Sequence, residues 1–461
     1  MKKIVFFLFA IALCSSINAQ KRPFPQNVNY GFGFKPTSIS NATVLNNYNS
    51  WKQTYLKECG TTKLRVEFNN PTGTTVSEGQ GYGMVISAYM GDSVTFNKLY
   101  TFEKSMHNQF GNMGWKVDCN GFIASAGGST SATDGDLDIS FSLCIAAVQW
   151  GKNYAQLAKD RINVIKKNNF TYNTTSKRWI QEWRDGTTET FGNTSYWCPG
   201  YYRVFKEFTG DADWDQIATD TYTLLLETCN TTTGFNANEV YVNSTSKSDY
   251  VDYNGARSPW RYVMDYLWTG NADAKNLVDK MTDWANAKGI ANVLDGYKIN
   301  GTPTSKWNQS PAWTGAWACG AMAKSQTVVN TFTANFNACT FDEYFASSLR
   351  LLYQLVLTGN YWKPSLIPVT SSKQSIKEST INIYPNPVKK NGKLTVNKYE
   401  ITNEVFTVQI FNLQGTAVYK TASVGQNGHY DIELNGLMTS GAYLLEIQNG
   451  NDIMNRKLIV N

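Results

Sequence analysis

Apolar side chains recur at intervals of three and four residues through much of the chain between residues 40 and 360. Clear examples are the stretches 141–150, 214–229, 263–269 and 345–357. This spacing places the apolar positions on one face of a helix. Alternation typical of strands is scarce there, and loops rich in Gly, Asn, Thr and Ser separate the periodic stretches. The pattern predicts an all-α domain over residues 20–362.

The pattern changes after residue 362. Residues 363–380 are rich in Ser, Lys, Pro and Thr and lack periodicity, which is typical of a linker. Beyond them, short alternating runs are separated by Gly, Asn and Asp turns, at 393–397, 406–411, 430–434, 442–448 and 455–460. We therefore expect a small antiparallel β-sandwich over residues 381–461, without a catalytic cluster.

The first 19 residues have the organisation of a secretory signal peptide. Basic residues at Lys2 and Lys3 precede an apolar run from Ile4 to Leu13, and small residues follow. A lipid anchor at Cys14 is the minor alternative, because a lipoprotein signal requires a small residue at the position of Leu13. No later stretch approaches the ~20 apolar residues needed to cross a bilayer. We expect a soluble, secreted, monomeric protein.

Composition limits the ligands and the kinds of chemistry that we expect. The formal charge of +6 falls to +4 without Lys2 and Lys3, and no dense Lys/Arg patch is present, so nucleic acid is not an expected partner. With only two histidines in the chain, we expect no metal site and no cofactor. The seven cysteines after the signal contain no CxxC pair and are interpreted mainly as buried small residues, with one or two disulfides permitted. Aromatic residues make up 14% of the chain, which favours a carbohydrate ligand because sugar rings stack on aromatic faces.

Three acidic or basic motifs could carry glycoside hydrolysis, which needs two carboxyl groups. Glu78 stands among glycines in the segment 77–84, although Ser77 and Glu78 could also simply begin a helix. A helix N-terminus lowers a carboxyl pKa, whereas a general acid needs a raised one, so desolvation or a second carboxylate would have to prevail.

The second motif is the acidic run 132–138, which contains Asp134. It fails as an EF-hand because Ile139 and Ile145 occupy positions that require Gly and Glu, and a helix cap is its simpler interpretation. The third motif is 253–261, where Arg257 and Arg261 lie four residues apart. Such an Arg could orient a carboxylate or form a purely structural ion pair.

Together these motifs resemble glycoside hydrolase family 8 across residues 27–362. The resemblance rests on SEGQGYGM, ATDGD, the Ser195-Tyr196-Trp197 segment before Pro199, and the run from Tyr253 to Arg261, in that order. It implies an (α/α)6 barrel that cuts a β-1,4-linked polysaccharide with inversion. It also implies site roles: Glu78 as general acid, Asp134 holding the sugar at the cleavage point, and Tyr196 and Arg257 around the attacking water and base. Our candidates for stacking on sugar rings are Tyr82, Trp115 and Trp197.

One position departs from the family pattern. Many members carry the catalytic base as an Asp directly after the Tyr of the third motif, but here that residue is Asn254, whose amide cannot accept a proton. A subgroup with a loop-borne base resembles this arrangement. The upstream loop offers Glu239, Asp252 and Asp249; we expect Glu239 first and Asp252 second, with Asn254 contacting the substrate.

The tail resembles the type A C-terminal sorting domain of the type IX secretion system of Bacteroidetes. The resemblance rests on the Tyr384-Pro385-Asn386-Pro387 opening, the run 441–447 and the closing run 457–460. A carbohydrate-binding module is the rival interpretation, disfavoured because the domain contains no Trp. We expect the type IX machinery as a partner and a secreted or surface-attached protein.

The leading hypothesis is an endo-acting, inverting β-1,4-glucanase acting on cellulose, carboxymethylcellulose or lichenan. Chitosanase and xylanase activity are alternatives within the family, and chitosan is disfavoured only weakly by the positive net charge. From other classes, a non-catalytic polysaccharide-binding protein stays open because of Asn254, as does an adhesin exported by the same tail.

Overall fold

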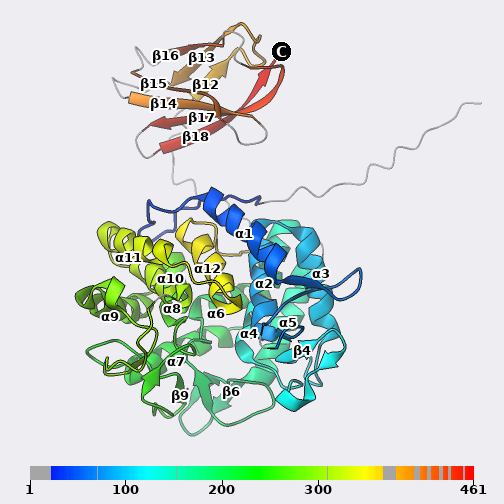
Figure 1. The fold of residues 1–461 in the computed structure, drawn as a ribbon, viewed down its shortest axis with the longest axis vertical. Coiled ribbons are helices and arrows are strands. Elements are labelled where there is room, and N and C mark those ends of the chain that lie inside the picture. Colours follow the sequence, from blue (N-terminus) through cyan, green and yellow to red (C-terminus); the bar gives the residue numbers. More distant parts are fainter. Residues whose placement is uncertain are drawn as a thin grey trace, which may run out of the picture. The chain divides into compact units, whose positions relative to one another are not determined.

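The computed structural model describes residues 22–366, except 70, 152 and 309, and residues 381–461, except 399–404, 413–416, 425–428, 435–437 and 450–451. The predicted signal peptide and most of the predicted linker lie outside these residues. The chain divides into two compact units between Leu366 and Ile367, a helical one and a strand-rich one (Figure 1). Among the described residues, no helix has both the length and the apolar character that a bilayer span requires.

The helical unit contains two concentric sets of helices. The inner helices contact one another in a closed ring, in the order α2 (Ser77–Met90), α4 (Thr133–Trp150), α6 (Pro199–Thr209), α8 (Ser258–Thr269), α10 (Pro311–Ala321) and α12 (Tyr344–Leu357). Outside them pack α1 (Asn41–Tyr55), α3 (Ser93–Ser105), α5 (Tyr154–Asn169), α7 (Asp213–Thr228), α9 (Ala272–Lys288) and α11 (Gln326–Ala338). The prediction of an (α/α)6 barrel is confirmed.

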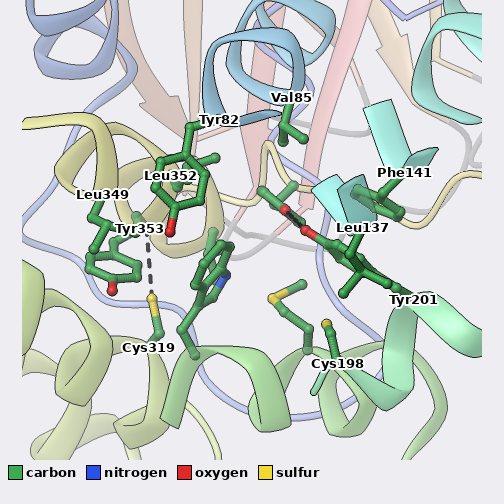
Figure 2. Close-up of a cluster of buried hydrophobic side chains, with 14 of the residues drawn as sticks. Tyr82, Val85, Leu137, Phe141, Cys198, Tyr201, Cys319, Leu349, Leu352 and Tyr353 are labelled. Atoms are coloured by element: carbon green, nitrogen blue, oxygen red, sulfur yellow. Dashed lines mark hydrogen bonds between the residues drawn. The ribbon is translucent and has the colours of Figure 1, made fainter. Parts of the chain in front are cut away.

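Burial explains the two sets. Every residue of α10 and nearly every residue of α4 is buried, since an inner helix meets neighbours on all sides. An outer helix such as α5 buries one stripe, including Ala158, Ile162 and Ile165, and exposes charged residues elsewhere. Figure 2 shows inner-helix side chains, among them Val85, Leu137 and Leu352, meeting in the barrel core.

The loops that lead into the inner helices gather at one face of the barrel. Consecutive helices alternate in direction, so all inner helices begin at the same end. These loops carry short strands: β1 (Leu56–Glu58), β2 (Leu64–Val66), β3 (Thr75–Val76), β4 (Lys116–Asp118), β5 (Gly121–Phe122), β6 (Phe170–Asn173), β7 (Arg178–Gln181), β8 (Phe191–Asn193), β9 (Glu239–Tyr241), β10 (Tyr250–Val251) and β11 (Tyr297–Lys298). With two to four residues each, they are too short to produce visible alternation in the sequence.

Two of these loops are joined covalently. A disulfide links Cys59, in the loop before α2, to Cys119, in the loop before α4. The other described cysteines are free, and all of them except Cys229 are buried. One of the two permitted disulfides therefore forms, and most of the remaining cysteines occupy buried positions as expected.

The C-terminal unit is a β-sandwich with antiparallel strand pairing, as predicted. One sheet contains β12 (Ile381–Tyr384), β13 (Lys393–Lys398) and β16 (His429–Glu433). The other has the order β15 (Ala417–Val424), β14 (Val405–Phe411), β17 (Gly441–Asn449) and β18 (Asp452–Val460). Leu394 and Ile432 from the first sheet share one core with Val408 and Leu445 from the second.

Candidate active site

Three charged residues from different inner helices meet at the loop-bearing face. Glu78 is the second residue of α2, Asp134 is the second residue of α4, and Arg257 directly precedes α8. Arg257 Nη1 donates to Glu78 Oε2 at 2.6 Å and to Asp134 Oδ2 at 2.7 Å. The same nitrogen contacts the Tyr82 hydroxyl at 2.8 Å. The first residues of the helices thus bring together side chains that are distant in sequence.

The buried Arg257 guanidinium joins the two carboxyl groups of this cluster. The side chain is 2% exposed, and its central carbon lies 5.2 Å from the centre of the Tyr196 ring and 5.8 Å from that of Phe345. Its contacts are charge-assisted hydrogen bonds, which are stronger and more directional than neutral ones. The structure therefore brings Glu78, Asp134, Tyr196 and Arg257 together.

The environment of Glu78 decides between the opposing electrostatic effects expected from the sequence. The pKa of Glu78 is raised to about 7; burial is the largest influence, and the nearby Asp134 carboxyl also raises it. The positive charge of Arg257 and the hydroxyl of Tyr344 oppose the rise in this pKa. Desolvation thus outweighs both the arginine and the helix N-terminus. A carboxyl group with a pKa near neutrality can donate a proton at physiological pH.

Tyr344, the first residue of α12, is a site residue that the sequence patterns did not indicate. Its hydroxyl donates to Glu78 Oε1 at 3.1 Å, and the side chain is buried. The ring passes so close to Gly79 that any β-carbon there would collide with it. The glycine next to Glu78 therefore makes room for this tyrosine.

Arg261 has a different role from Arg257. It forms a bidentate ion pair with Asp138, at 2.8 Å and 2.6 Å, and both side chains are buried. This pair joins α8 to α4 in the barrel interior. Its position fits the structural alternative that the sequence left open for this motif.

An open cavity of about 530 Å³ adjoins Glu78 and Arg257. Three aromatic side chains in its wall are substantially exposed: Trp307 by 36%, Phe341 by 37% and Tyr253 by 43%. Trp307 and Phe341 meet edge to face, with ring centroids 4.6 Å apart. These residues were not among the predicted sugar contacts, because their residue type alone does not reveal that they remain exposed.

The prediction that Tyr82 and Trp197 stack on sugar rings is wrong. Tyr82 is 0% exposed and contacts Arg257, and Trp197 is 1% exposed and donates its indole N–H to the Gln181 carbonyl at 3.2 Å. Neither ring presents a face to a ligand, because both belong to the packed core. Trp115 is half-buried and stays a candidate.

The three loop carboxylates differ in environment. Asp249 is 62% exposed and pairs with Lys298 at 2.9 Å, which lowers its pKa. Glu239 is half-buried in β9, and burial raises its pKa, with Asp252 adding to the rise. Asp252 is also half-buried, and its Oδ1 accepts from the Asn238 side chain and the backbone N–H of Asn254.

Glu239 is connected to the catalytic cluster through paired strands. Residue Asn193 of β8 stands opposite Glu239 of β9. The Asn193 carbonyl accepts from the backbone N–H of Tyr196 at 3.0 Å, and the Tyr196 ring lies against Arg257. Asn254 is exposed and lines the cavity, where it can contact a ligand.

Comparison with known proteins agrees with this architecture. The model of glycosyl hydrolases family 8 matches residues 24–359, and that of the secretion system C-terminal sorting domain matches residues 382–461. A beta-glucanase of Niallia circulans is 33% identical over 75% of this chain and 92% of its own length. An endoglucanase of Bacillus sp. (strain KSM-330) is 34% identical over 76% of this chain and 84% of its own length.

A solved structure is also similar to this chain in its fold. The apo structure of a beta-1,3-1,4-glucanase from Paenibacillus sp. X4 has a TM-score of 0.68 and 31% identity, and the match covers 75% of this chain and 100% of that one. The sorting domain indicates secretion through the type IX system of Bacteroidetes. With the family match over the whole barrel and the carboxyl cluster at its mouth, the chain belongs to glycosyl hydrolase family 8 and is a glycoside hydrolase.

Proposed function

We propose that this enzyme hydrolyses internal bonds of β-1,4-linked glucan and inverts the configuration at the cleaved carbon. The observation that carries the proposal is the Glu78 carboxyl, whose pKa is raised to about 7 and which lines an open cavity with exposed aromatic walls. Cleavage of a polysaccharide requires a proton donor for the leaving oxygen and surfaces on which sugar rings can stack. The names of the relatives, beta-glucanase and endoglucanase, support glucan as the substrate.

In this mechanism Glu78 protonates the glycosidic oxygen while the bond between that oxygen and the anomeric carbon breaks. A water molecule attacks the same carbon from the opposite face and passes its proton to a second carboxylate. Arg257 and Tyr344 hold the two oxygens of Glu78, so the group is already oriented for proton donation.

Asp134 is unsuited to serve as the base of an inverting enzyme. Its Oδ2 and Glu78 Oε2 both lie within 2.7 Å of Arg257 Nη1, so these oxygens are at most about 5.3 Å apart. Inversion needs about 6.5–9.5 Å between the carboxyl groups to accommodate the water. We assign Asp134 to holding the sugar at the cleavage point and to raising the pKa of Glu78.

We assign the base to Glu239. Its raised pKa and partial burial support a role in proton transfer, and its strand partner leads directly to Tyr196 beside Arg257. Asp252 is the second choice, because Asn238 and the backbone of Asn254 already occupy one of its oxygens. Asp249 is disfavoured by its exposure and its ion pair with Lys298.

The stereochemistry is tested by following the first product by NMR on a β-1,4-glucan oligosaccharide. We expect the α-anomer to appear first. Initial release of the β-anomer would contradict inversion and point instead to Asp134 as a nucleophile, since retaining enzymes hold their carboxyl groups about 5–5.5 Å apart.

The substrate is tested by reducing-sugar release from carboxymethylcellulose, lichenan, chitosan and xylan. We expect the two glucans to be cut fastest, with a rapid fall in viscosity because internal bonds are broken. Preference for chitosan or xylan, or release of single sugars without loss of viscosity, would refute the assigned specificity.

The base is tested with three isosteric variants, Glu239→Gln, Asp252→Asn and Asp249→Asn, the last as matched control. We expect Glu239→Gln to lower kcat by about 10²- to 10⁴-fold, the range for loss of a general base. Asp249→Asn should retain wild-type kcat. A loss in Asp252→Asn with an active Glu239→Gln would transfer the role to Asp252.

A further inference from the structure

A second cavity, of about 440 Å³, contains none of the proposed catalytic residues in its lining. Its lining comes from two loops, the one before α4, with Asn108, Gln109, Phe110, Phe122, Ser129 and Thr130, and the one before α6, with Arg184, Asp185 and Gly186. Its size falls in the range of small-ligand sites.

The second cavity lies on the same face of the barrel as the catalytic cluster, because the loops that precede the inner helices all lie there. The cavity beside Glu78 is built from segments leading into α2, α8, α10 and α12. The second cavity is built from the segments leading into α4 and α6, across the ring from α10 and α12. Glu78 and Arg257 line the first cavity, and Asp134, which contacts Arg257, stands at the start of α4, the helix whose preceding loop lines the second cavity. A sugar chain that extends from the first cavity past Asp134 would therefore approach the second cavity.

Backbone contacts tie the second cavity to the cleavage point. The N–H of Trp115 donates to the Thr130 carbonyl at 2.7 Å, so the half-buried Trp115 adjoins the lining. The N–H of Thr133, the residue before Asp134, donates to the carbonyl of Trp183, the residue before Arg184. One wall is therefore bonded to Trp115, and the other is bonded to the first residue of α4, next to Asp134.

The two walls are held rigidly by a buried carboxylate. Asp185 is 1% exposed; its Oδ2 accepts from Asn108 Nδ2 at 2.7 Å and from Asn112 Nδ2 at 3.1 Å, and its Oδ1 accepts from the Ser131 N–H at 3.1 Å. These bonds cross from one loop to the other. A cavity fixed in this way loses little conformational entropy when a ligand binds.

The chemistry of the lining suits a neutral sugar chain. Phe110 and Phe122 are 36% and 40% exposed, and the Phe110 ring packs over Gly186, which has a positive φ and no side chain to displace it. Around the rings stand amide and hydroxyl groups that can bond sugar hydroxyls, together with Arg184. Apolar faces combined with neutral polar groups match the alternating C–H and O–H surfaces of a glucan.

We infer that this cavity is a distal subsite, which binds glucosyl units of the same β-glucan chain remote from the bond that is cut. The inference rests on the proposed glucanase function and deepens it. It assigns Phe110 and Phe122 to substrate length recognition, so the enzyme gains rate from chains long enough to reach them.

The test compares the wild type with the Phe110→Ala/Phe122→Ala double variant on cello-oligosaccharides of increasing length and on lichenan. Phe32→Ala is the matched control, because Phe32 is also an exposed ring packed over a positive-φ glycine, Gly270, at the opposite end of α8. The kcat/KM ratio of the longest to the shortest substrate should fall by about two- to tenfold in the double variant, through KM, the range for lost aromatic contacts. Phe32→Ala should keep the wild-type ratio.

A direct binding measurement makes the result independent of turnover. In the Glu78→Gln background, calorimetry with the longest oligosaccharide should show a Kd weakened by a similar factor when the two phenylalanines are removed, and Phe122→Ala alone should show part of it. Length profiles that stay parallel in wild type and double variant, with unchanged Kd, would overturn the distal subsite while leaving the glucanase function intact. A wild type that cuts no β-glucan would overturn the proposed function itself.

Discussion

The hydrogen bond from Tyr344 to Glu78 allows a quantitative test of the general acid. The Tyr344 hydroxyl donates to Glu78 Oε1 at 3.1 Å and lowers the pKa of Glu78 against the larger, raising effect of burial. Replacing Tyr344 by Phe removes this donor and keeps the ring. A hydrogen bond to a charged group contributes about 1.5–3 kcal/mol, and 1.36 kcal/mol corresponds to one pH unit. Since part of that energy persists with the neutral acid, the pKa of Glu78 should rise by about one unit.

The sign of the effect on activity follows from the role of Glu78. A general acid is active when protonated, so kcat/KM should decline as the pH rises through the pKa of about 7. In Tyr344→Phe this alkaline limb should move to about pH 8. The assay is the pH dependence of kcat/KM on a soluble β-glucan. The control is Tyr353→Phe, a buried tyrosine of the same helix whose hydroxyl donates to the Ala312 carbonyl at 3.0 Å. An unmoved alkaline limb, or one displaced to lower pH, would refute the assignment of Glu78.

Three further predictions concern stability. Burial raises the pKa of Glu182 from 4.5 to about 7, so the stability that this group contributes is complete below pH 4.5 and is lost as the pH rises to 7. Glu182→Gln should therefore raise Tm relative to wild type at pH 8 but not at pH 5. Equal Tm differences at both pH values would contradict this prediction. Arg261→Met leaves Asp138 buried without its partner, which should cost about 3–5 kcal/mol in urea unfolding; a cost below 1 kcal/mol would show that the pair is dispensable. The disulfide between Cys59 and Cys119 spans 60 residues, so Cys59→Ser should lower the free energy of unfolding by about 4 kcal/mol. The Tm of this variant should no longer depend on reductant. A lower Tm of the variant in reductant would refute this prediction.

The chain's periodicity alone was enough to predict an all-α domain followed by a β-sandwich, whereas the barrel was expected from the resemblance of the motifs to family 8. A spacing of three and four reflects the local geometry of a helix, and alternation reflects that of a strand, so neither requires knowledge of distant contacts. The motifs around Glu78, Asp134 and Arg257 were likewise visible, because each places a charged group at the start of an inner helix, where glycines and small residues make the segment recognisable.

Only the tertiary structure decided which side chains meet and which remain exposed. Tyr344 lies 266 residues from Glu78 and reaches it because the ring of helices closes between α12 and α2. Trp197 and Trp307 are the same residue type, yet one is packed in the core and the other lines a cavity. Exposure and contact depend on how separate segments pack together, which no local pattern records; for the same reason, Asp249 could be set apart from Glu239 only once its ion pair with Lys298 was known.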